Sequence, residues 1–369
     1  MFKKYKIKYY NFRLLFVVLL ASVMGVLAVG SADPTYQNKQ MLGAIAGIII
    51  MIIVSLISYN FILKFYWVIY LVNALLLAAT YTNFGDSTNG AQRWLKFGGI
   101  TFQPSETAKL LLILFFAQFI MLNRKSINHI LKLSLTCILF LVPALLIYKQ
   151  PDLSTTLVIV TIFCVMLFVG GISWKYILTV ASILLPVVLV FVFLAIQPEA
   201  TLLENHQKER ILAFINPEEY SDSTAYQQLN SVLAIASGQL EGKGYMNNEV
   251  TSVKNGQYIL EPHTDFIFAV IGEEFGYYGS IAVVTVLFSI VLECLYVAYK
   301  AKDISGQLVA AGMAAWIGFQ SFFNLGVATF ILPNTGLPLP FISYGLTSLW
   351  SLYLGIGVVL NINLQQRRK

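Results

Sequence analysis

Charged side chains are scarce in this chain. Asp, Glu, Lys and Arg make up 11% of its 369 residues, whereas hydrophobic residues make up 57%. Soluble domains carry about 25% charged residues, so this shortage of charge excludes an ordinary water-soluble protein. Cysteine is also rare, and Cys137, Cys164 and Cys294 all lie inside apolar runs, where a free thiol behaves as a small hydrophobe. The sequence therefore predicts neither a disulfide framework nor a cysteine metal site.

Sequence motifs for nucleotides and metals are missing too. The chain contains no G-x-G-x-x-G, no P-loop lysine motif, no H-E-x-x-H and no Cys/His spacing typical of a metal site. Its formal net charge of +6 comes mainly from cations at the chain ends and in short loops, which is typical of membrane topology rather than of nucleic-acid binding. We therefore expect no nucleic-acid partner. An enzyme built on this chain would take its substrate from the lipid phase or from the outer side.

Long apolar runs dominate the sequence. Runs of about 20 apolar residues recur along a chain of mean hydropathy +0.73, and a helix of that length crosses a hydrocarbon core of roughly 30 Å. The sequence predicts an all-α polytopic membrane protein, one domain over residues 1–369, with about ten transmembrane helices. The predicted spans are residues 12–32, 40–59, 61–82, 104–123, 133–149, 153–171, 175–196, 280–299, 306–330 and 341–362.

The placement of cations predicts the orientation of these spans. With the N-terminus in the cytoplasm, alternation puts both chain ends and most Lys and Arg residues on the inner side, as the positive-inside rule requires. The stretch "AVGSA" resembles a signal-peptide cleavage site, but the length of the first span favours a retained helix. Two long loops then face outwards, one after the third span and one over residues 197–279. Loops of such length are usually functional or disordered, and a helix-like stretch over residues 224–237 argues against disorder in the second.

The strongest catalytic candidate lies in "EPHTDFIFAVIGEE", residues 261–274. Asp265 is a carboxylate beside an apolar wall, where partial desolvation raises a pKa and makes the group a stronger general base. The alternative is a structural role as the cap of a helix that starts at Asp265, with His263 and Thr264 as further cap candidates.

The apolar run that follows is too long for one membrane span. As a single helix, residues 266–299 would measure about 51 Å, so Gly276 and Gly279 predict a break between a short surface helix and a span from about residue 280. Glu273 and Glu274 lie about 100° apart on that short helix. For both we expect pairing with cations rather than catalysis.

Charges near the outer ends of spans supply further candidates. Glu106 and Lys109 share one helical face, and they either neutralise each other between helices or offer a cation to an anionic substrate. Arg93 and Lys96 flank the interfacial aromatic Trp94 in "AQRWLKFG", which fits either substrate binding or a membrane anchor.

Three other stretches are open to two interpretations each. Asp152 opens a span as a helix cap or as part of a site. Arg210 lies in "ERILAFINPEEY", which predicts an amphipathic surface helix or a ligand contact. The proline-rich stretch "LPNTGLPLPFISYG" cannot form one regular helix, and irregular backbone at membrane depth lines a cavity or is buried in protein.

Together these motifs resemble the SEDS family of polytopic membrane proteins, which includes RodA, FtsW and SpoVE. The resemblance covers essentially the whole chain through "NGAQRWLKFGGITFQPSETAKL", "KQPDLSTT", "ERILAFINP", "HTDFIFAVIGEEFG" and "NTGLPLPFISYG". The chain has "YGLTS" where Y-G-G-S-S is usual and "FILP" where G-L-L-P is usual. "QPDL" and "ERILAFINP" lean towards RodA, whereas "AVIGEE" is more typical of FtsW-like members.

The resemblance implies a peptidoglycan glycosyltransferase that polymerises lipid II, with inversion, into β-1,4-linked strands for cell wall elongation and cell shape. It implies that Asp265 is the essential aspartate, on the outer face of the plasma membrane, and that a class B penicillin-binding protein is the partner. For the departing diphosphate, the candidates for charge stabilisation are Arg93, Lys96 and Lys109, and a divalent cation, Mg²⁺ or Mn²⁺, is a further candidate. The expected substrate contacts are Arg93, Trp94, Lys96, Glu106, Lys109, Asp152, Arg210, His263, Thr264 and Ser343.

Three alternatives stay open at this point. A flippase for the same lipid-linked precursor would also use ten spans and an intramembrane Glu/Lys pair, but it needs headgroup contacts on both sides. A scaffold would only position a partner synthase. A member of the division or sporulation subgroup would share the chemistry and differ in its role.

Overall fold

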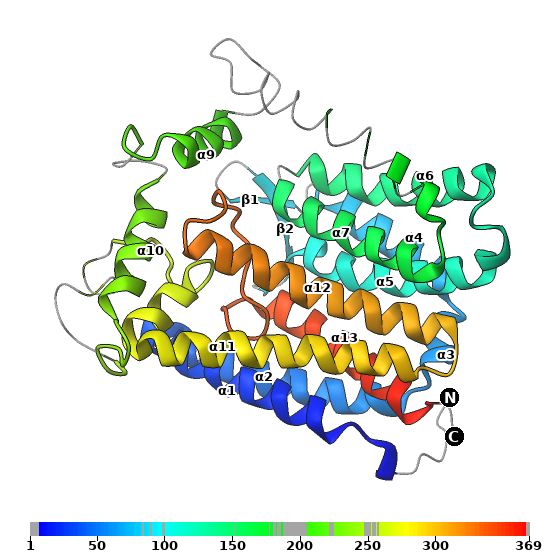
Figure 1. Ribbon diagram of the computed structural model, residues 1–369, viewed down its shortest axis with the longest axis horizontal. Helices are drawn as coiled ribbons and strands as arrows, with labels where there is room; N and C mark the ends of the chain where they lie inside the picture. Colours follow the sequence, from blue (N-terminus) through cyan, green and yellow to red (C-terminus); the bar gives the residue numbers. More distant parts are fainter. Residues whose placement is uncertain are drawn as a thin grey trace.

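Helices form the body of the protein. The computed structural model describes residues 7–82, 85–88, 91–97, 100–150, 152–176, 178–179, 182, 186, 205–220, 225–246, 252, 256 and 258–366. The long helices run side by side, both chain termini lie at one end of the bundle, and two short helices, α9 (Asn205–Ile215) and α10 (Tyr226–Ser237), lie at the other (Figure 1).

Eight helices in the described part are long and apolar enough to cross a membrane. They confirm eight of the predicted spans. Most ends differ by a few residues, but the helix expected at 40–59 already begins at Pro34, and the span expected at 280–299 is part of a helix that begins at Ile267. The helices are α1 (Phe12–Ala32), α2 (Pro34–Leu56), α5 (Pro104–Asn123), α6 (Ile130–Tyr148), α7 (Leu153–Gly170), α11 (Ile267–Lys300), α12 (Ile304–Ala328) and α13 (Leu346–Leu364).

The remaining two predicted spans have different outcomes. The expected span 61–82 is divided into α3 (Tyr59–Leu63) and the shorter apolar helix α4 (Tyr66–Ala79), with the exposed Lys64 at the turn between them. The turn keeps the ammonium group at the end of the bundle, where burial in hydrocarbon is avoided. The expected span 175–196 lies mostly outside the described residues.

Short polar residues determine where several spans begin. The Asn11 side chain accepts a hydrogen bond from the backbone N–H of Leu14 at the start of α1, and Asp33 does the same for Thr35 at the start of α2. Asp303 caps α12 through the N–H of Gly306. Each cap satisfies a backbone donor that the helix itself leaves unpaired.

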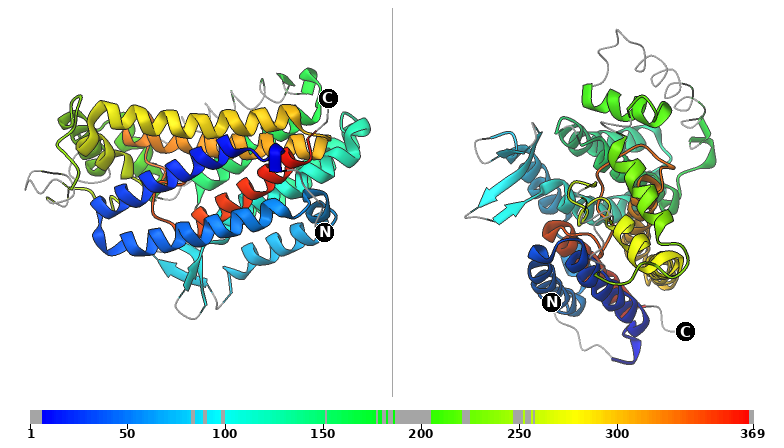
Figure 2. Two further views of the ribbon diagram at one scale, coloured as in Figure 1. Left: turned by 90° about the horizontal axis from the view of Figure 1, so that it is seen from below. Right: turned by 90° about the vertical axis from the view of Figure 1, so that its left-hand side faces the viewer.

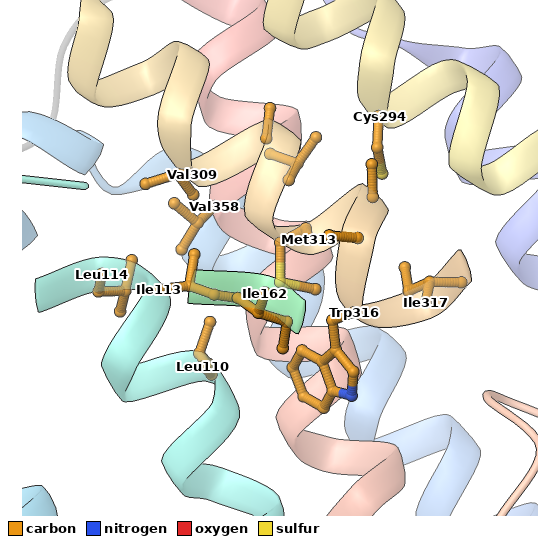
Figure 3. Close-up of a cluster of buried hydrophobic side chains, with 14 of the residues drawn as sticks. Leu110, Ile113, Leu114, Ile162, Cys294, Val309, Met313, Trp316, Ile317 and Val358 are labelled. Carbon is orange, nitrogen blue, oxygen red and sulfur yellow. The ribbon is translucent and has the colours of Figure 1, made fainter. Parts of the chain in front are cut away.

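The core lies where α5, α7, α12 and α13 meet. Figure 3 shows Ile113 of α5, Ile162 of α7, Met313 of α12 and Val358 of α13 converging on one apolar cluster. All four side chains are buried. The central helices α12 and α13 are therefore apolar on nearly every side, and the few polar residues that they carry stand out as candidates for a special role.

The loop expected between the third and fourth spans is a small antiparallel sheet. Strands β1 (Gly85–Thr88), β2 (Ala91–Phe97) and β3 (Ile100–Phe102) pair in chain order, and Figure 2 shows them projecting beside the bundle. The register shifts by one residue between β1 and β2, so that Arg93 is the extra residue of a bulge. A bulge turns a side chain out of the regular alternation.

The predicted break in the long helix is confirmed at Gly276. α11 contains 34 residues, but Gly276 has φ 60° and ψ −154°, which is not helical. Backbone groups of residues 239–244 supply the missing partners: Lys243 N donates to Glu273 O at 2.9 Å and Tyr277 N donates to Gln239 O at 2.9 Å. At this break, backbone groups that the helix leaves without a partner form hydrogen bonds with a neighbouring segment of the chain.

We predict that Gly276→Ala destabilises the fold. A Cβ there would lie 2.5 Å from the backbone nitrogen of Gly242, and this backbone conformation is essentially restricted to glycine, so a cost of about 1–3 kcal/mol or more is expected. The measurement is the thermal unfolding midpoint in detergent. Gly318→Ala is the matched control, because its Cβ would meet Val291 at an ordinary 3.6 Å. Equal midpoints for the two variants would contradict this account of the break.

Candidate functional site

Asp265 lies just before α11, against the irregular segment of residues 332–345 that joins α12 to α13. A Cβ on Gly336 would lie 3.3 Å from Asp265 Oδ2, and the φ of Gly336 is +69°. Glycine at this position thus allows the backbone to approach the carboxylate closely. The backbone oxygen of Asp265 accepts a hydrogen bond from Asn324 Nδ2 at 2.7 Å, which fixes the residue from α12.

The predicted cap role of Asp265 is wrong. α11 begins at Ile267, its N-cap position is Phe266, and no side chain caps it. The hydroxyl of Thr264 instead donates to the backbone oxygen of Glu261 at 2.9 Å. The Asp265 carboxylate is therefore not used to start the helix.

The surroundings of Asp265 favour its protonated form. Burial raises the pKa of Asp265 to about 6, the Arg210 guanidinium opposes this rise, and Glu261 and Asp152 add to it. Arg93 also lowers this pKa. Three of the predicted site residues, from β2, α9 and the start of α7, therefore act electrostatically on the same carboxylate.

Arg210 projects from α9, the amphipathic surface helix that the sequence predicts. Burial lowers the pKa of Arg210, and the Asp265 and Asp152 carboxylates raise it. Its Nη1 donates to the backbone oxygen of Asn334 at 3.5 Å. Arg210 is thus a half-buried cation whose charge interacts with two carboxylates, a setting in which it acts more strongly on an anionic ligand than it would in open water.

On β2, Arg93 contacts the bundle, whereas Trp94 and Lys96 are more exposed than Leu95 between them. Arg93 Nε donates to the backbone oxygen of Gln150 at 2.8 Å, which ties the sheet to the start of α7. The buried Leu95 alternates with the half-buried Trp94 and the exposed Lys96, so these two face away from the side that Leu95 buries. Of the two cations in this stretch, Arg93 is the one that acts on the pKa of Asp265.

Asp152 caps a helix and also contributes charge to the site. Its Oδ1 accepts a hydrogen bond from Thr155 N at 3.0 Å, which confirms the predicted cap. Its Oδ2 accepts from Ser105 Oγ at 3.4 Å. The carboxylate is therefore held in place by α5 and α7 together while its charge acts on Asp265.

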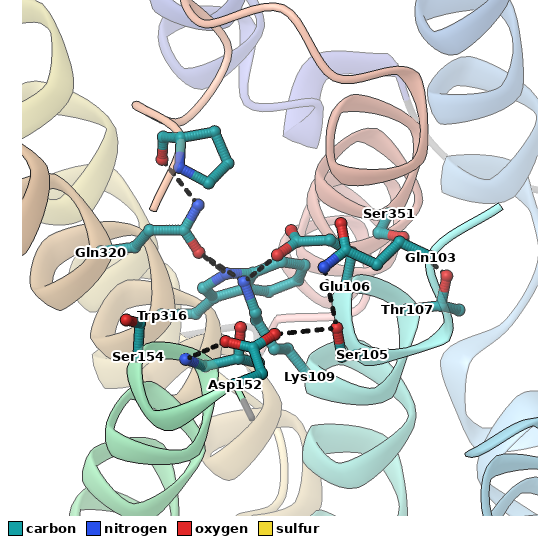
Figure 4. A network of polar contacts seen from close by, with 12 residues as sticks. Gln103, Ser105, Glu106, Thr107, Lys109, Asp152, Ser154, Trp316, Gln320 and Ser351 are labelled. Atoms are coloured by element: carbon teal, nitrogen blue, oxygen red, sulfur yellow. Dashed lines mark hydrogen bonds and ion pairs between the residues drawn. The ribbon is translucent and has the colours of Figure 1, made fainter. Parts of the chain in front are cut away.

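Glu106 and Lys109 form a buried ion pair inside the bundle (Figure 4). Lys109 Nζ lies 2.6 Å from Glu106 Oε1 and donates to Gln320 Oε1 at 2.8 Å. The same Gln320 oxygen accepts from Trp316 Nε1 at 2.7 Å. No part of the Lys109 side chain is exposed, so this cation is directed towards groups of the protein rather than towards solvent.

Two amides of α12 connect this pair to the loop beside Asp265. Gln320 Nε2 donates to Pro338 O at 2.8 Å, and Asn324 Nδ2 donates to Leu337 O at 2.7 Å. These two residues were not among the predicted site residues. Their signal was available, since they are amides four residues apart, on one face of an apolar span.

Ser343, His263 and Thr264 hold the same loop against the segment that carries Asp265. Ser343 Oγ donates to Thr264 O at 2.5 Å and accepts from Leu339 N at 2.8 Å. The His263 ring is buried, stacks on Tyr36 at 4.3 Å, and has a pKa lowered by burial. These groups are directed towards neighbouring protein atoms.

Glu273 and Glu274 take part in structural pairing near the break in α11. Glu273 Oε1 lies 2.8 Å from Lys243 Nζ, as expected of a paired acid. Glu274 Oε1 accepts a hydrogen bond from Ser31 Oγ at 2.5 Å, and its pairing with a cation stays a prediction. Both residues connect α11 to other parts of the bundle.

A resident metal does not fit the described residues. Among them, no group of three or more His, Cys, Asp and Glu side chains could hold a metal ion. A Mg²⁺ ion carried by a diphosphate needs only one or two carboxylates from the protein. In the described part of the site, the carboxylates of Glu261 and Asp152 are the ones whose charge acts on the pKa of Asp265.

The arrangement suits proton abstraction next to an anionic leaving group. A carboxylate of pKa about 6 is mainly ionised at neutral pH and is a stronger base than an ordinary aspartate. Two guanidinium groups nearby can stabilise negative charge as it develops.

Comparison with known protein families matches the chain over nearly its whole length. Residues 6–368 match the family described as cell cycle protein, FtsW/RodA/SpoVE. Peptidoglycan glycosyltransferase MrdB of Escherichia coli (strain K12) is 31% identical over 96% of this chain and 93% of its own length. The probable peptidoglycan glycosyltransferase FtsW of Bacillus subtilis (strain 168) is 32% identical over 98% of this chain and 92% of its own length.

Solved structures are similar in fold over the same extent. A chain from a peptidoglycan synthase complex that coordinates polymerization and crosslinking superposes with a TM-score of 0.82 at 28% identity, over 98% of this chain and 99% of that chain. The rod shape determining protein RodA of Thermus thermophilus gives a TM-score of 0.71 at 26% identity, over 98% of both chains. The helical membrane architecture described above is therefore similar to that of proteins whose structures have been solved.

Proposed function

The chain belongs to the FtsW/RodA/SpoVE family and is a peptidoglycan glycosyltransferase, and from this premise we propose that Asp265 is the general base of its reaction. The observation that supports this assignment is the setting of Asp265. It is a carboxylate whose pKa is raised to about 6 by burial, and it lies within electrostatic reach of Arg210 and Arg93. It also takes no part in capping α11.

The proposed substrate is lipid II, which carries its sugar on a polyprenyl diphosphate. Asp265 accepts the proton of the 4-hydroxyl group on the acceptor sugar as that oxygen attacks the anomeric carbon of the donor. The bond from this carbon to the diphosphate breaks, and the electron pair leaves with the diphosphate oxygen. Attack from the face opposite the leaving group converts an α-linked donor into a β-1,4 linkage, so one base is sufficient.

Arg210 and Arg93 are proposed to stabilise the negative charge that grows on the diphosphate. Both act on the pKa of Asp265, and Arg210 is half-buried. Lys109 has a different proposed role, because its ammonium group is bonded to Glu106 and Gln320. It positions the loop at Pro338 through Gln320 and does not touch the substrate. A divalent cation, if the reaction uses one, would be held by the diphosphate together with Asp265 or Asp152.

We further propose that the site faces the outside of the plasma membrane and that both termini lie in the cytoplasm. The N-terminus of α1 and the C-terminus of α13 lie close together, since Asn363 Nδ2 donates to Tyr9 O at 2.8 Å. Asp265 lies at the opposite end of the bundle, next to the C-terminal end of α12. The cation-rich termini then occupy the inner side.

The proposed partner is a class B penicillin-binding protein, which is a transpeptidase. Support comes from the similar chain in a complex that coordinates polymerization with crosslinking. A role in elongation, as opposed to division or sporulation, is proposed from the RodA-like motifs of the sequence. The identities of 31% to MrdB and 32% to FtsW do not separate these subgroups.

The test is polymerisation of purified lipid II in detergent, read as a ladder of glycan strands. A flippase or a scaffold would yield no ladder.

We predict that Arg210→Gln lowers the rate of polymerisation about 10- to 100-fold, because one preorganised cation for the leaving group is lost. Lys208→Gln is the matched control, since it removes the same charge from the same helix two residues away, about 200° around the axis. Equal rates for the two variants would remove Arg210 from the mechanism.

A further inference from the structure

A second recess lies between α1 and α11, at the end of the bundle opposite Asp265. One hollow of about 500 Å³ is lined by Phe12, Phe16, Val17 and Leu292, with Arg13 and Glu293 at its edge. We call this recess the α1/α11 groove. Phe12 is 56% exposed, Phe16 65% and Leu292 48%, so the apolar floor of the groove faces outward from the bundle.

A second hollow adjoins the groove at its polar end. It has a volume of about 280 Å³, shares Phe12 and Arg13 with the groove, and also includes Lys8, Tyr296 and Lys300 in its lining. Three cations therefore surround the place where the apolar floor meets the end of the bundle.

The charges at this junction are unbalanced. Glu293 is the one acid among the residues that line the two hollows. It already accepts a hydrogen bond from Asn11 Nδ2 at 2.9 Å and lies 3.3 Å from Arg13 Nε. Lys8 and Lys300 are both exposed. An anionic group placed between these cations would meet a net positive field beside an apolar surface.

We propose that the α1/α11 groove binds one anionic phospholipid of the membrane. The phosphate lies among Lys8, Arg13 and Lys300, and an acyl chain lies along Phe12, Phe16 and Leu292. Basic pockets between transmembrane helices are suited to anionic headgroups. The charge of the pocket selects the headgroup, and the apolar floor accepts the chain whatever the headgroup.

The charge pattern distinguishes a lipid from a second transmembrane helix as the occupant. A helix lying in the groove would bring an apolar stretch against Phe16 and Leu292. It would leave Lys8 and Lys300 without a matching anion, because Glu293, the one acid of the lining, already pairs with Arg13. A phospholipid joins an anionic group to an apolar chain, just as the two hollows are joined through Phe12 and Arg13. The proposal does not depend on the reaction at Asp265, which lies at the other end of the bundle.

The test is native mass spectrometry of the delipidated protein titrated with phosphatidylglycerol or with phosphatidylethanolamine. We expect phosphatidylglycerol to bind about 10-fold more tightly. The triple variant Lys8→Gln, Arg13→Gln, Lys300→Gln should lose this preference. The matched control is Lys64→Gln, Lys125→Gln, Lys132→Gln, which removes the same charge from exposed positions outside the groove, and it should keep the preference.

The triple variant removes the Arg13–Glu293 ion pair and could fail to fold for that reason, so two further variants leave Arg13 in place. Lys8→Gln with Lys300→Gln changes two exposed side chains, and it should weaken phosphatidylglycerol alone. Phe16→Ser should weaken both lipids equally. Equal binding of the two lipids by the unaltered protein, or an equal loss in the control variant, would overturn the proposal. So would a stable dimer that retains no lipid and dissociates on Phe16→Ser, because the groove would then hold a second copy.

Discussion

Asp265→Asn is expected to abolish polymerisation of lipid II, with a rate about 10²- to 10⁴-fold below that of the unaltered protein. The amide has nearly the shape of the carboxylate but cannot accept the proton of the attacking hydroxyl group. Glu241→Gln is the matched control, because Glu241 is an exposed acid and is not among the groups that act on the pKa of Asp265. The measurement is the initial rate of glycan formation by purified protein in detergent. A rate for Asp265→Asn close to that of the control would exclude the proposed base.

The pH dependence of the rate gives a second readout of the same group. Since the pKa of Asp265 is raised to about 6, activity should rise with pH through about 6 and level off above it, as the base becomes ionised. Glu261 raises this pKa through its charge, so Glu261→Gln should move the midpoint to lower pH. A merely structural role for Asp265 would leave the midpoint unmoved.

The same shift has a consequence for stability. A carboxyl group whose pKa is about 6 in the folded protein and 3.8 in its ordinary state disfavours folding once it is ionised. This unfavourable contribution is absent below about pH 3.8, grows as pH rises, and is complete above about pH 6. Asp265→Asn removes it, so the inactive variant should have the higher unfolding temperature at pH 8 and lose this advantage at pH 4.

Lys109→Met is expected to destabilise the protein by about 3–5 kcal/mol, because it leaves Glu106 as an uncompensated buried charge. The Lys109 side chain is not exposed, and that of Glu106 is 4% exposed, so water cannot replace the lost partner. The double variant Glu106→Gln, Lys109→Met removes both charges and should recover most of the loss. Thermal unfolding can be followed by tryptophan fluorescence, since Trp316 lies beside the pair.

The double variant also separates two roles of the pair. If it is stable but polymerises slowly, the pair positions the loop through Gln320 and Pro338, as proposed. If it is stable and fully active, the pair only neutralises charge between helices. A cost below about 1 kcal/mol for Lys109→Met alone would contradict the buried pair itself.

The sequence predicted the membrane helices well because their signal is local. A run of about 20 apolar residues has few alternatives to a spanning helix, so α1 and α5 have the predicted bounds, and the start of α7 at Leu153 follows from the cap Asp152. The break at Gly276 was predictable from length, since the apolar run was too long for one span and a glycine lay in it.

The sheet between α4 and α5 was not predicted because its outer strands give too little local signal. β1, Gly85–Thr88, contains no apolar side chain, and β3, Ile100–Phe102, is only three residues long, which is too short for an alternation to be recognised. The bulge at Arg93 depends on the pairing of β1 with β2. No local property of the stretch around Arg93 specifies which partner strand it will meet.

The sequence predicted the charged residues of the candidate site but not the two amide residues, Gln320 and Asn324. Asp265, Arg210, Arg93 and Asp152 were recognisable because charge is rare in this chain, and the structure brings them together. The role of Gln320 depends on a contact with Pro338, 18 residues later, and such a contact follows only from the path of the irregular loop. The cap role expected for Asp265 was wrong for a similar reason. Asp265 is held by a contact with Asn324, which is distant in the sequence, and α11 starts two residues later without a side-chain cap.

The loop of residues 332–345 also determines when an active enzyme can first exist during translation. Asp265 is held by Asn324, and the segment before it by Ser343 and by Tyr344 N, which donates to His263 O at 2.9 Å. These partners are made after Asp265 itself, and the loop is anchored by α13, which packs against α2 from the beginning of the chain. A nascent chain in which α13 has not yet been made therefore lacks the contacts that hold Asp265 and the segment before it in place.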